Sequence, residues 1–282
     1  MSKFKLLALA IPVSLFVSCS SNKSGDSATD TVTDTVAVMD TTPINEMANY
    51  KFSYTIANLP SPLEVLEEFN SSGFAANADL LNSPDNVNNY HTSLKQAFNY
   101  GIYGVDLAYS VVNNRAPDII KYYSCSKKLA EQLNLGETFN KFVNRFEVNA
   151  NNKDSLKRVV DQAYASTDQY LRSNERLKTA SEILAGSWIE GQYITVNLLK
   201  DAERTEQNEK LYTRVWEQRL YLENIAGIFN EFKDDAELSK IKKDLDSLLE
   251  LYKEPKDAKE VSKDLLVRLS NNLGRVRNNI VK

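Results

Sequence analysis

Two acidic residues stand out because each lies inside an otherwise apolar stretch of the sequence. Asp106 falls within residues 98–109, and Glu190 falls within residues 183–196. As helices, both stretches are apolar on nearly every side, a pattern typical of helices buried in the middle of a fold. A carboxylate in such surroundings is paired, protonated or directed into a water-filled cavity. These two residues are therefore the first candidates for chemistry.

Aromatic residues near both carboxylates offer hydrogen-bond donors, and two interpretations follow. One is a pocket in the bundle core that binds a small ligand or a cation. The residues of that predicted pocket are Asp106, Glu190, Tyr103, Tyr109, Trp188 and Tyr193. The other interpretation is a purely structural set of hydrogen bonds from each carboxylate to tyrosine hydroxyls or to a helix N-terminus. The sequence leaves both open.

Residue types that catalysis and metal binding usually require are scarce. His91 is the single histidine, and the two cysteines are Cys19 and Cys125. A zinc site of the usual kind needs several His or Cys ligands, and a catalytic triad needs a base beside its nucleophile. We find no catalytic residues, no metal site, no cofactor motif and no phosphate-binding loop, and we expect a non-enzymatic protein. Cys125 is expected to be a buried, inert thiol.

The body of the chain, from residue 50 to 282, carries the periodicity of helices. Apolar residues recur at alternating spacings of three and four, which places them on one helix face. One such set is Leu238, Ile241, Leu245, Leu248 and Tyr252. No convincing strand pattern occurs. We predict an all-α fold in a single domain, an irregular multi-helix bundle of about eight to ten helices.

Helix-breaking residues and glycines refine this prediction of the fold. The first helix is expected to begin at Pro60 or Pro62, a second to span residues 87–112, and a break to fall within residues 173–181. Each of the two apolar helices also contains two glycines. Glycine inside a helix costs about 1 kcal/mol relative to alanine, so it usually marks a close approach of another backbone. We predict that the two apolar helices pack against each other, or against neighbours, at these glycines.

The first residues resemble a bacterial lipoprotein signal. Lys3 and Lys5 precede an apolar run over residues 6–17, which is too short for a membrane span of about 20 residues. Ser18-Cys19 then resembles the end of a lipobox. We expect residues 1–18 to be a signal peptide and Cys19 to carry the lipid that anchors the chain to the membrane. An ordinary secreted protein with a cysteine near its cleavage site is the alternative.

Residues 19–49 are polar and contain no aromatic residue, a composition expected of a flexible tether. Ser20 after the cysteine resembles the outer-membrane class of lipoproteins, so we expect a lipid-anchored protein of the cell envelope at the outer membrane. Periplasmic and surface exposure are not distinguished. The net charge is −4 for the full chain and about −2 from residue 50 onward. This nearly neutral body argues against nucleic-acid binding.

Four segments carry a resemblance to a known group. They are Leu59-Pro60-Ser61-Pro62-Leu63, Leu81-Asn82-Ser83-Pro84-Asp85-Asn86-Val87, Tyr103-Gly104-Val105-Asp106-Leu107 and Gly186-Ser187-Trp188-Ile189-Glu190. The chain is similar in these to a group of uncharacterised helical envelope lipoproteins. The resemblance implies a helical lipoprotein and no known activity. We expect a binding or accessory protein with an envelope protein partner, or alternatively a bundle that binds a small ligand or a cation through its buried carboxylates and tyrosines.

Overall fold

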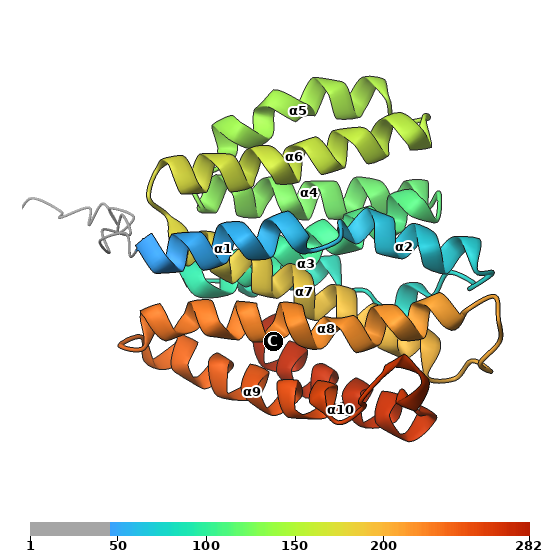
Figure 1. Cartoon of the computed structure of the whole chain (residues 1–282). Helices are drawn as coiled ribbons and strands as arrows, with labels where there is room; N and C mark the ends of the chain where they lie inside the picture. Colours follow the sequence, from blue (N-terminus) through green and yellow to red (C-terminus); the bar gives the residue numbers. More distant parts are fainter. Residues whose placement is uncertain (1–45) are drawn as a thin grey trace, which may run out of the picture. The chain divides into compact units, whose positions relative to one another are not determined.

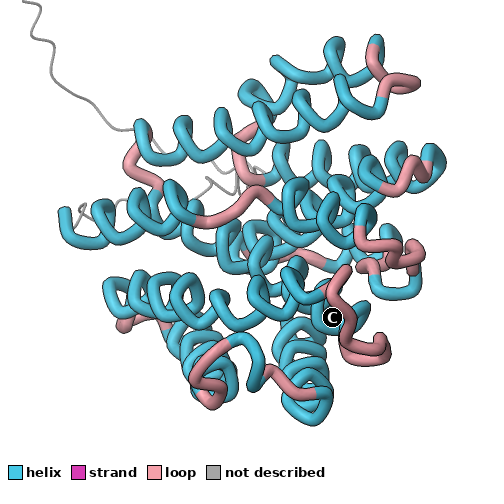
Figure 2. The backbone as a smooth tube through the Cα atoms, turned by 45° about the vertical axis from the view of Figure 1, so that its right-hand side comes forward, coloured by secondary structure: helices cyan, strands magenta, loops and turns pink. Residues whose placement is uncertain are grey.

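Helices build all the regular structure of residues 46–282, the part of the chain that the computed structural model describes. This part contains ten α-helices, four short 3-10 helices and no strand (Figure 2). The predicted all-α bundle is therefore confirmed, at the upper end of the expected helix number. The predicted signal peptide, Cys19 and residues 20–45 of the predicted tether lie outside the described residues.

The α-helices are α1 (Glu46–Asn58), α2 (Pro62–Ser71), α3 (Ser93–Val112), α4 (Ala116–Gln132), α5 (Gly136–Val148), α6 (Lys153–Ser173), α7 (Leu177–Leu199), α8 (Glu209–Ile228), α9 (Ala236–Lys253) and α10 (Lys263–Val281). The 3-10 helices are η1 (Ala78–Leu80), η2 (Pro84–Asn89), η3 (Phe229–Phe232) and η4 (Ala258–Glu260). Several helix starts are fixed by side-chain caps. Thr92, Asn152 and Ser262 each accept a hydrogen bond from the backbone N–H three residues later.

Helices α3 and α7 form the centre of the bundle and share its most extensive contact. Both are buried along most of their length. In Figure 1, α4, α5 and α6 lie on one side of this pair, α8, α9 and α10 lie on the other, and α1 and α2 pass in front. The prediction of two helices buried in the middle of the fold is confirmed.

Glycine allows α3 and α7 to meet backbone to backbone, which confirms the prediction at Gly101 and Gly186. Gly104 instead packs against Tyr164 of α6, and an added Cβ on Gly191 would meet nothing within 4 Å. A Cβ added to Gly186 would lie 2.1 Å from the carbonyl oxygen of Phe98. One added to Gly101 would lie 2.2 Å from the carbonyl oxygen of Ile183. Neither position has room for any side chain, so the two glycines set the distance between the helices.

Two predicted boundaries are wrong, and one is confirmed. Helix α1 begins at Glu46, inside the predicted tether and before the prolines expected to open the first helix. The buried face of α1 includes the polar Thr55 as well as Phe52, so the sequence does not show a continuous apolar pattern for this helix. The predicted 87–112 helix is two elements, η2 and α3, because Tyr90 is extended and Thr92 caps α3. The predicted break within 173–181 is confirmed between α6 and α7.

Replacing Gly186 by alanine is expected to lower the free energy of unfolding by about 3 kcal/mol, because the new methyl group forces α3 and α7 apart. Gly191→Ala, on the same helix, is the matched control, since nothing lies within 4 Å of its added Cβ. That change is expected to stabilise the protein by up to about 1 kcal/mol. Urea denaturation measures both. Equal effects of the two substitutions would contradict the role of Gly186 in the contact between α3 and α7.

Candidate functional site

Asp106 on α3 and Glu190 on α7 meet in the core, as the pairing of their helices requires. Both side chains are completely buried. The pKa of Asp106 is raised well above its ordinary value, first by burial and then by the negative charge of Glu190. A hydrogen bond between the two carboxyl groups, which requires a proton on one of them, raises it further. Burial and the charge of Glu190 therefore favour the neutral form of Asp106 in the folded protein.

Arg277 on α10 completes this cluster, and the sequence did not single it out. Its Nε and Nη2 donate to the two carboxylate oxygens of Glu190 at 2.5 and 2.7 Å. Its guanidinium lies over the ring of Tyr193, 4.5 Å from the centroid, and Nη2 also donates to the carbonyl of Leu80. Burial lowers the pKa of Arg277, but the charge of Glu190 keeps it above the ordinary value. The cluster of a protonated Asp106, Glu190 and Arg277 is thus neutral overall.

The backbone near η1 closes the cluster from another side. The N–H of Asn82 donates to Oδ2 of Asp106 at 3.2 Å. The amide of Asn82 donates to the hydroxyl of Tyr90, which in turn donates to the carbonyl of Val281. Asp106 and Glu190 do not line the large cleft described below. Within the described residues, their contacts match the structural interpretation of the two carboxylates more closely than a pocket.

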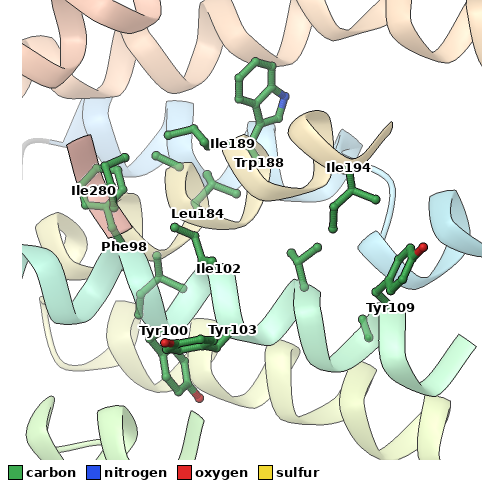
Figure 3. Close-up of a cluster of buried hydrophobic side chains, with 14 of the residues drawn as sticks. Phe98, Tyr100, Ile102, Tyr103, Tyr109, Leu184, Trp188, Ile189, Ile194 and Ile280 are labelled. Carbon is green, nitrogen blue, oxygen red and sulfur yellow. The ribbon is translucent and has the colours of Figure 1, made fainter. Parts of the chain in front are cut away.

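The other residues of the predicted pocket are dispersed. The hydroxyl of Tyr103 donates to the carbonyl of Ser83 at 2.8 Å, and that of Tyr109 accepts the N–H of Asn77 at 2.7 Å. Figure 3 shows Trp188 pointing away from α3, whereas Tyr103 points away from α7. Trp188 donates through Nε1 to Oε1 of Gln218 at 2.9 Å. Of the predicted set, only Asp106, Glu190 and Tyr193 gather around Arg277.

A separate cleft is the larger candidate binding site, with a volume of about 840 Å³. Its lining comes from α1, the segment 59–62, α6 and α7, together with Tyr100 of α3. Apolar side chains dominate these walls, including Phe52, Ile56, Leu171, Ile183 and Leu184. Pro60 and Pro62 also line it and have no backbone N–H to leave unpaired there.

The polar groups of the cleft come mainly from one face of α6. Arg172 donates through Nε and Nη2 to Oδ2 of Asp168, at 3.0 and 2.7 Å. The other oxygen, Oδ1, is buried and has no hydrogen-bond partner among the described residues. Burial raises the pKa of Asp168, against the opposing effect of Arg172. The hydroxyl of Tyr164, one helical turn earlier, is likewise buried without a partner in the part of the chain that the structure describes.

Two further polar pairs line the same cleft, one of a carboxylate with a hydroxyl and one of two hydroxyls. Asp161 accepts a hydrogen bond from Ser61 at 2.8 Å, and the hydroxyls of Tyr100 and Thr167 lie 3.4 Å apart. None of these residues was predicted from the sequence to form a site. Tyr164 and Asp168 stand at the edge of an ordinary apolar stripe, where polar residues are normal, so periodicity gave no signal.

Other chemically active residues show no site. Cys125 is buried as expected, and burial raises the pKa of its thiol to about 11, so it stays a thiol. His91 is exposed. Across residues 46–282, no three His, Cys, Asp or Glu side chains gather in a way that could hold a metal ion. None of the helices in that same range has the length and apolar character needed to cross a membrane.

Comparison with known proteins adds no relative, since no family model, no curated protein and no solved structure matches this chain. The similarity to envelope lipoproteins stays a prediction.

Replacing each carboxyl of the buried cluster by its amide is expected to have opposite results at Glu190 and Asp106. Glu190→Gln leaves Arg277 buried without a counter-charge and is expected to cost about 3–5 kcal/mol of stability. Asp106→Asn keeps a neutral N–H donor toward Glu190, and its Oδ1 can still accept the N–H of Asn82. It is therefore expected to fold at least as stably as the wild type near neutral pH.

The two variants also differ in pH dependence. The pKa of Asp106 is higher in the folded state than in the unfolded state. Its contribution to folding stability is therefore complete at acid pH and is lost as pH rises through the folded-state pKa. Asp106→Asn should remove this loss, so its stability should fall less than that of the wild type between about pH 5 and about pH 8. Urea denaturation across this range checks both effects. A strongly destabilised Asp106→Asn with an unaffected Glu190→Gln would contradict the assignment of the proton to Asp106.

Proposed function

We propose that this chain is a lipid-anchored, non-enzymatic binding protein of the cell envelope whose helical body takes a small ligand in the cleft between α1, α6 and α7. The anchor rests on the lipobox-like Ser18-Cys19 after an apolar run. The binding role rests on the cleft. Its volume of about 840 Å³ lies within the range of about 300–1,000 Å³ typical of small-molecule sites.

The lining indicates what kind of ligand fits. Apolar walls favour an apolar body, and the polar groups at α6 favour a hydrogen-bond donor. The single observation that carries this proposal is the buried, unpartnered Oδ1 of Asp168. A carboxylate oxygen accepts but does not donate, so it favours an N–H donor, and a charged amine most of all.

Charge in the cleft argues against an anionic ligand. Asp161 and Asp168 both line it, and Arg172, the only basic residue that the described part of the chain contributes to the lining, already donates to Asp168. An anion would face two carboxylates without a free cationic partner there. The ligand class that this geometry supports is an amine with an apolar body.

A docking surface for a protein partner, the accessory role expected from the sequence, has less support. The large apolar side chains exposed on the described part of the chain are Tyr50, Tyr54, Ile120, Val148, Leu220 and Val267. They are spread over α1, α4, α5, α8 and α10. Apolar residues scattered in this way are normal on a soluble surface and do not mark an interface.

The anchor is tested by metabolic labelling with an alkyne fatty acid in a Gram-negative host. The wild type is expected to carry the label and to partition with the membrane fraction, and Cys19→Ser should lose the label. Cys125→Ser is the matched control, since it removes the only other cysteine and should stay labelled. Equal labelling of the wild type and Cys19→Ser would rule out lipidation at Cys19.

Ligand class is tested with three probes of similar size, phenylbutylamine, phenylbutanol and phenylpentanoate. The lipidated chain in lipid nanodiscs is titrated by saturation-transfer NMR, with protein-free nanodiscs as the blank. The amine is expected to bind most tightly and the acid most weakly. Asp168→Asn should weaken binding of the amine about tenfold, because it loses a charge-assisted hydrogen bond, and leave the alcohol unchanged.

Glu250→Gln is the control for this experiment, because it removes an exposed carboxylate on α9, outside the cleft lining. It should bind all three probes as the wild type does. Equal binding of the acid and the amine, or an Asp168→Asn variant that binds the amine normally, would refute the proposed ligand class.

A further inference from the structure

The two aspartates of the cleft lie on one face of α6, two helical turns apart. Asp161 and Asp168 are separated by seven residues, and both line the cleft. At 3.6 residues per turn, seven residues make almost two full turns, so the two side chains leave the helix in nearly the same direction. The rise of 1.5 Å per residue places them about 10 Å apart along the axis of α6. The cleft therefore offers a carboxylate at two separate positions along its length.

The surface between the two carboxylates is largely apolar. Tyr164 and Ala165 occupy the intervening turn on the same face of α6, and both line the cleft. Ile56 of α1 and Ile183 of α7 belong to the same lining. An aliphatic chain laid along this face would be in contact with carbon atoms over most of its length. The order along the helix is thus carboxylate, apolar stretch, carboxylate.

The two carboxylates differ in the partners that they already have. Arg172 donates to Oδ2 of Asp168 and leaves the buried Oδ1 without a partner among the described residues. Asp161 accepts from the hydroxyl of Ser61, which is neutral, and it forms no ion pair within the described part of the chain.

The negative charge of Asp161 is therefore uncompensated, and its side chain is exposed, so a ligand in the cleft can reach it. The distance of about 10 Å between the two positions is comparable with the Debye length at physiological salt, so Arg172 does little to neutralise Asp161. A cationic group is favoured at Asp161 independently of the one at Asp168.

We propose that the ligand of the cleft is a dication, a linear molecule with two ammonium groups joined by an aliphatic chain that spans about two turns of α6. One ammonium group donates to Oδ1 of Asp168 and the other donates to Asp161. An ammonium group has only donors and a carboxylate has only acceptors, so both ends are matched. The chain between them lies against Tyr164 and Ala165. This inference rests on the proposed amine-binding function of the cleft.

The matched probes are 1,8-diaminooctane and 8-amino-1-octanol, which have the same length and differ in one terminal group. Both are titrated against the lipidated full chain in nanodiscs by saturation-transfer NMR, with protein-free nanodiscs as the blank. The wild type is expected to bind the diamine about sixfold more tightly, about twofold because either amine can bind at Asp168 and about threefold from an exposed ion pair at Asp161. Added salt should reduce the part that comes from Asp161, because salt screens exposed charges.

Asp161→Asn removes the charge and keeps an oxygen that can accept the hydroxyl of Ser61. It should reduce the advantage of the diamine to about twofold and leave the affinity for the amino alcohol unchanged. Asp168→Asn should weaken the binding of both probes. Asp154→Asn is the matched control, since Asp154 lies seven residues before Asp161 on α6, pairs with Lys157 and is outside the cleft lining. It should bind both probes as the wild type does.

The outcomes separate this inference from the proposed function. If phenylbutylamine binds in an Asp168-dependent way but Asp161→Asn leaves the sixfold advantage intact, the dication is refuted and the cleft stands. A wild type that prefers the diamine only twofold refutes it equally. If the wild type binds no amine at all, both proposals fall together.

Discussion

The backbone contact between α3 and α7 is the constraint on which the rest of the structure depends. With Gly101 and Gly186 facing the partner backbone, the helices approach to a distance that no other residue permits. That contact buries both helices along most of their length, and it takes Asp106 and Glu190 into the core with them. Two carboxyl groups in an apolar interior cannot both stay ionised at low cost. The proton on Asp106 and the guanidinium of Arg277 follow from the packing.

Arg277 links parts of the chain that are far apart in the sequence. It joins the carboxylate of Glu190 to the carbonyl of Leu80, and Asn82 reaches Asp106 from the same segment. Helix α10 is therefore fixed to the central pair by charge as well as by its apolar stripe. Leaving any one of these partners out would bury an uncompensated group, which makes the cluster a strong determinant of how α10 docks.

Sequence patterns predicted the features that depend on local repetition. Helical periodicity gave the fold class, and the glycines in two apolar helices gave their contact. The start at Glu46 was missed because Thr55 occupies an inward position of α1 where an apolar residue was expected. Arg277 was missed because it follows Val276 within an amphipathic stripe, and a charged residue beside such a stripe is normally solvated. Its burial is decided by a helix far away in the sequence, which no local pattern reports.

The cleft could not be predicted from the sequence for a related reason. Tyr164 and Asp168 stand at the edge of the α6 stripe, and whether such residues are covered depends on how α1 and segment 59–62 lie against α6 and α7.

Comparing the two acidic sites shows why the cleft, and not the core, is the place for a ligand. Both Asp106 and Asp168 have a pKa raised by burial, and both lie near an arginine. In the core, the partners come from α7, α10 and the segment near η1, and neither Asp106 nor Glu190 lines the cleft. In the cleft, Arg172 engages one oxygen of Asp168 and leaves the other without a donor. Asp106 is fully buried and does not line the cleft, so a ligand has no route to it, whereas Asp168 lines the cleft and its Oδ1 gains a hydrogen bond when a donor arrives.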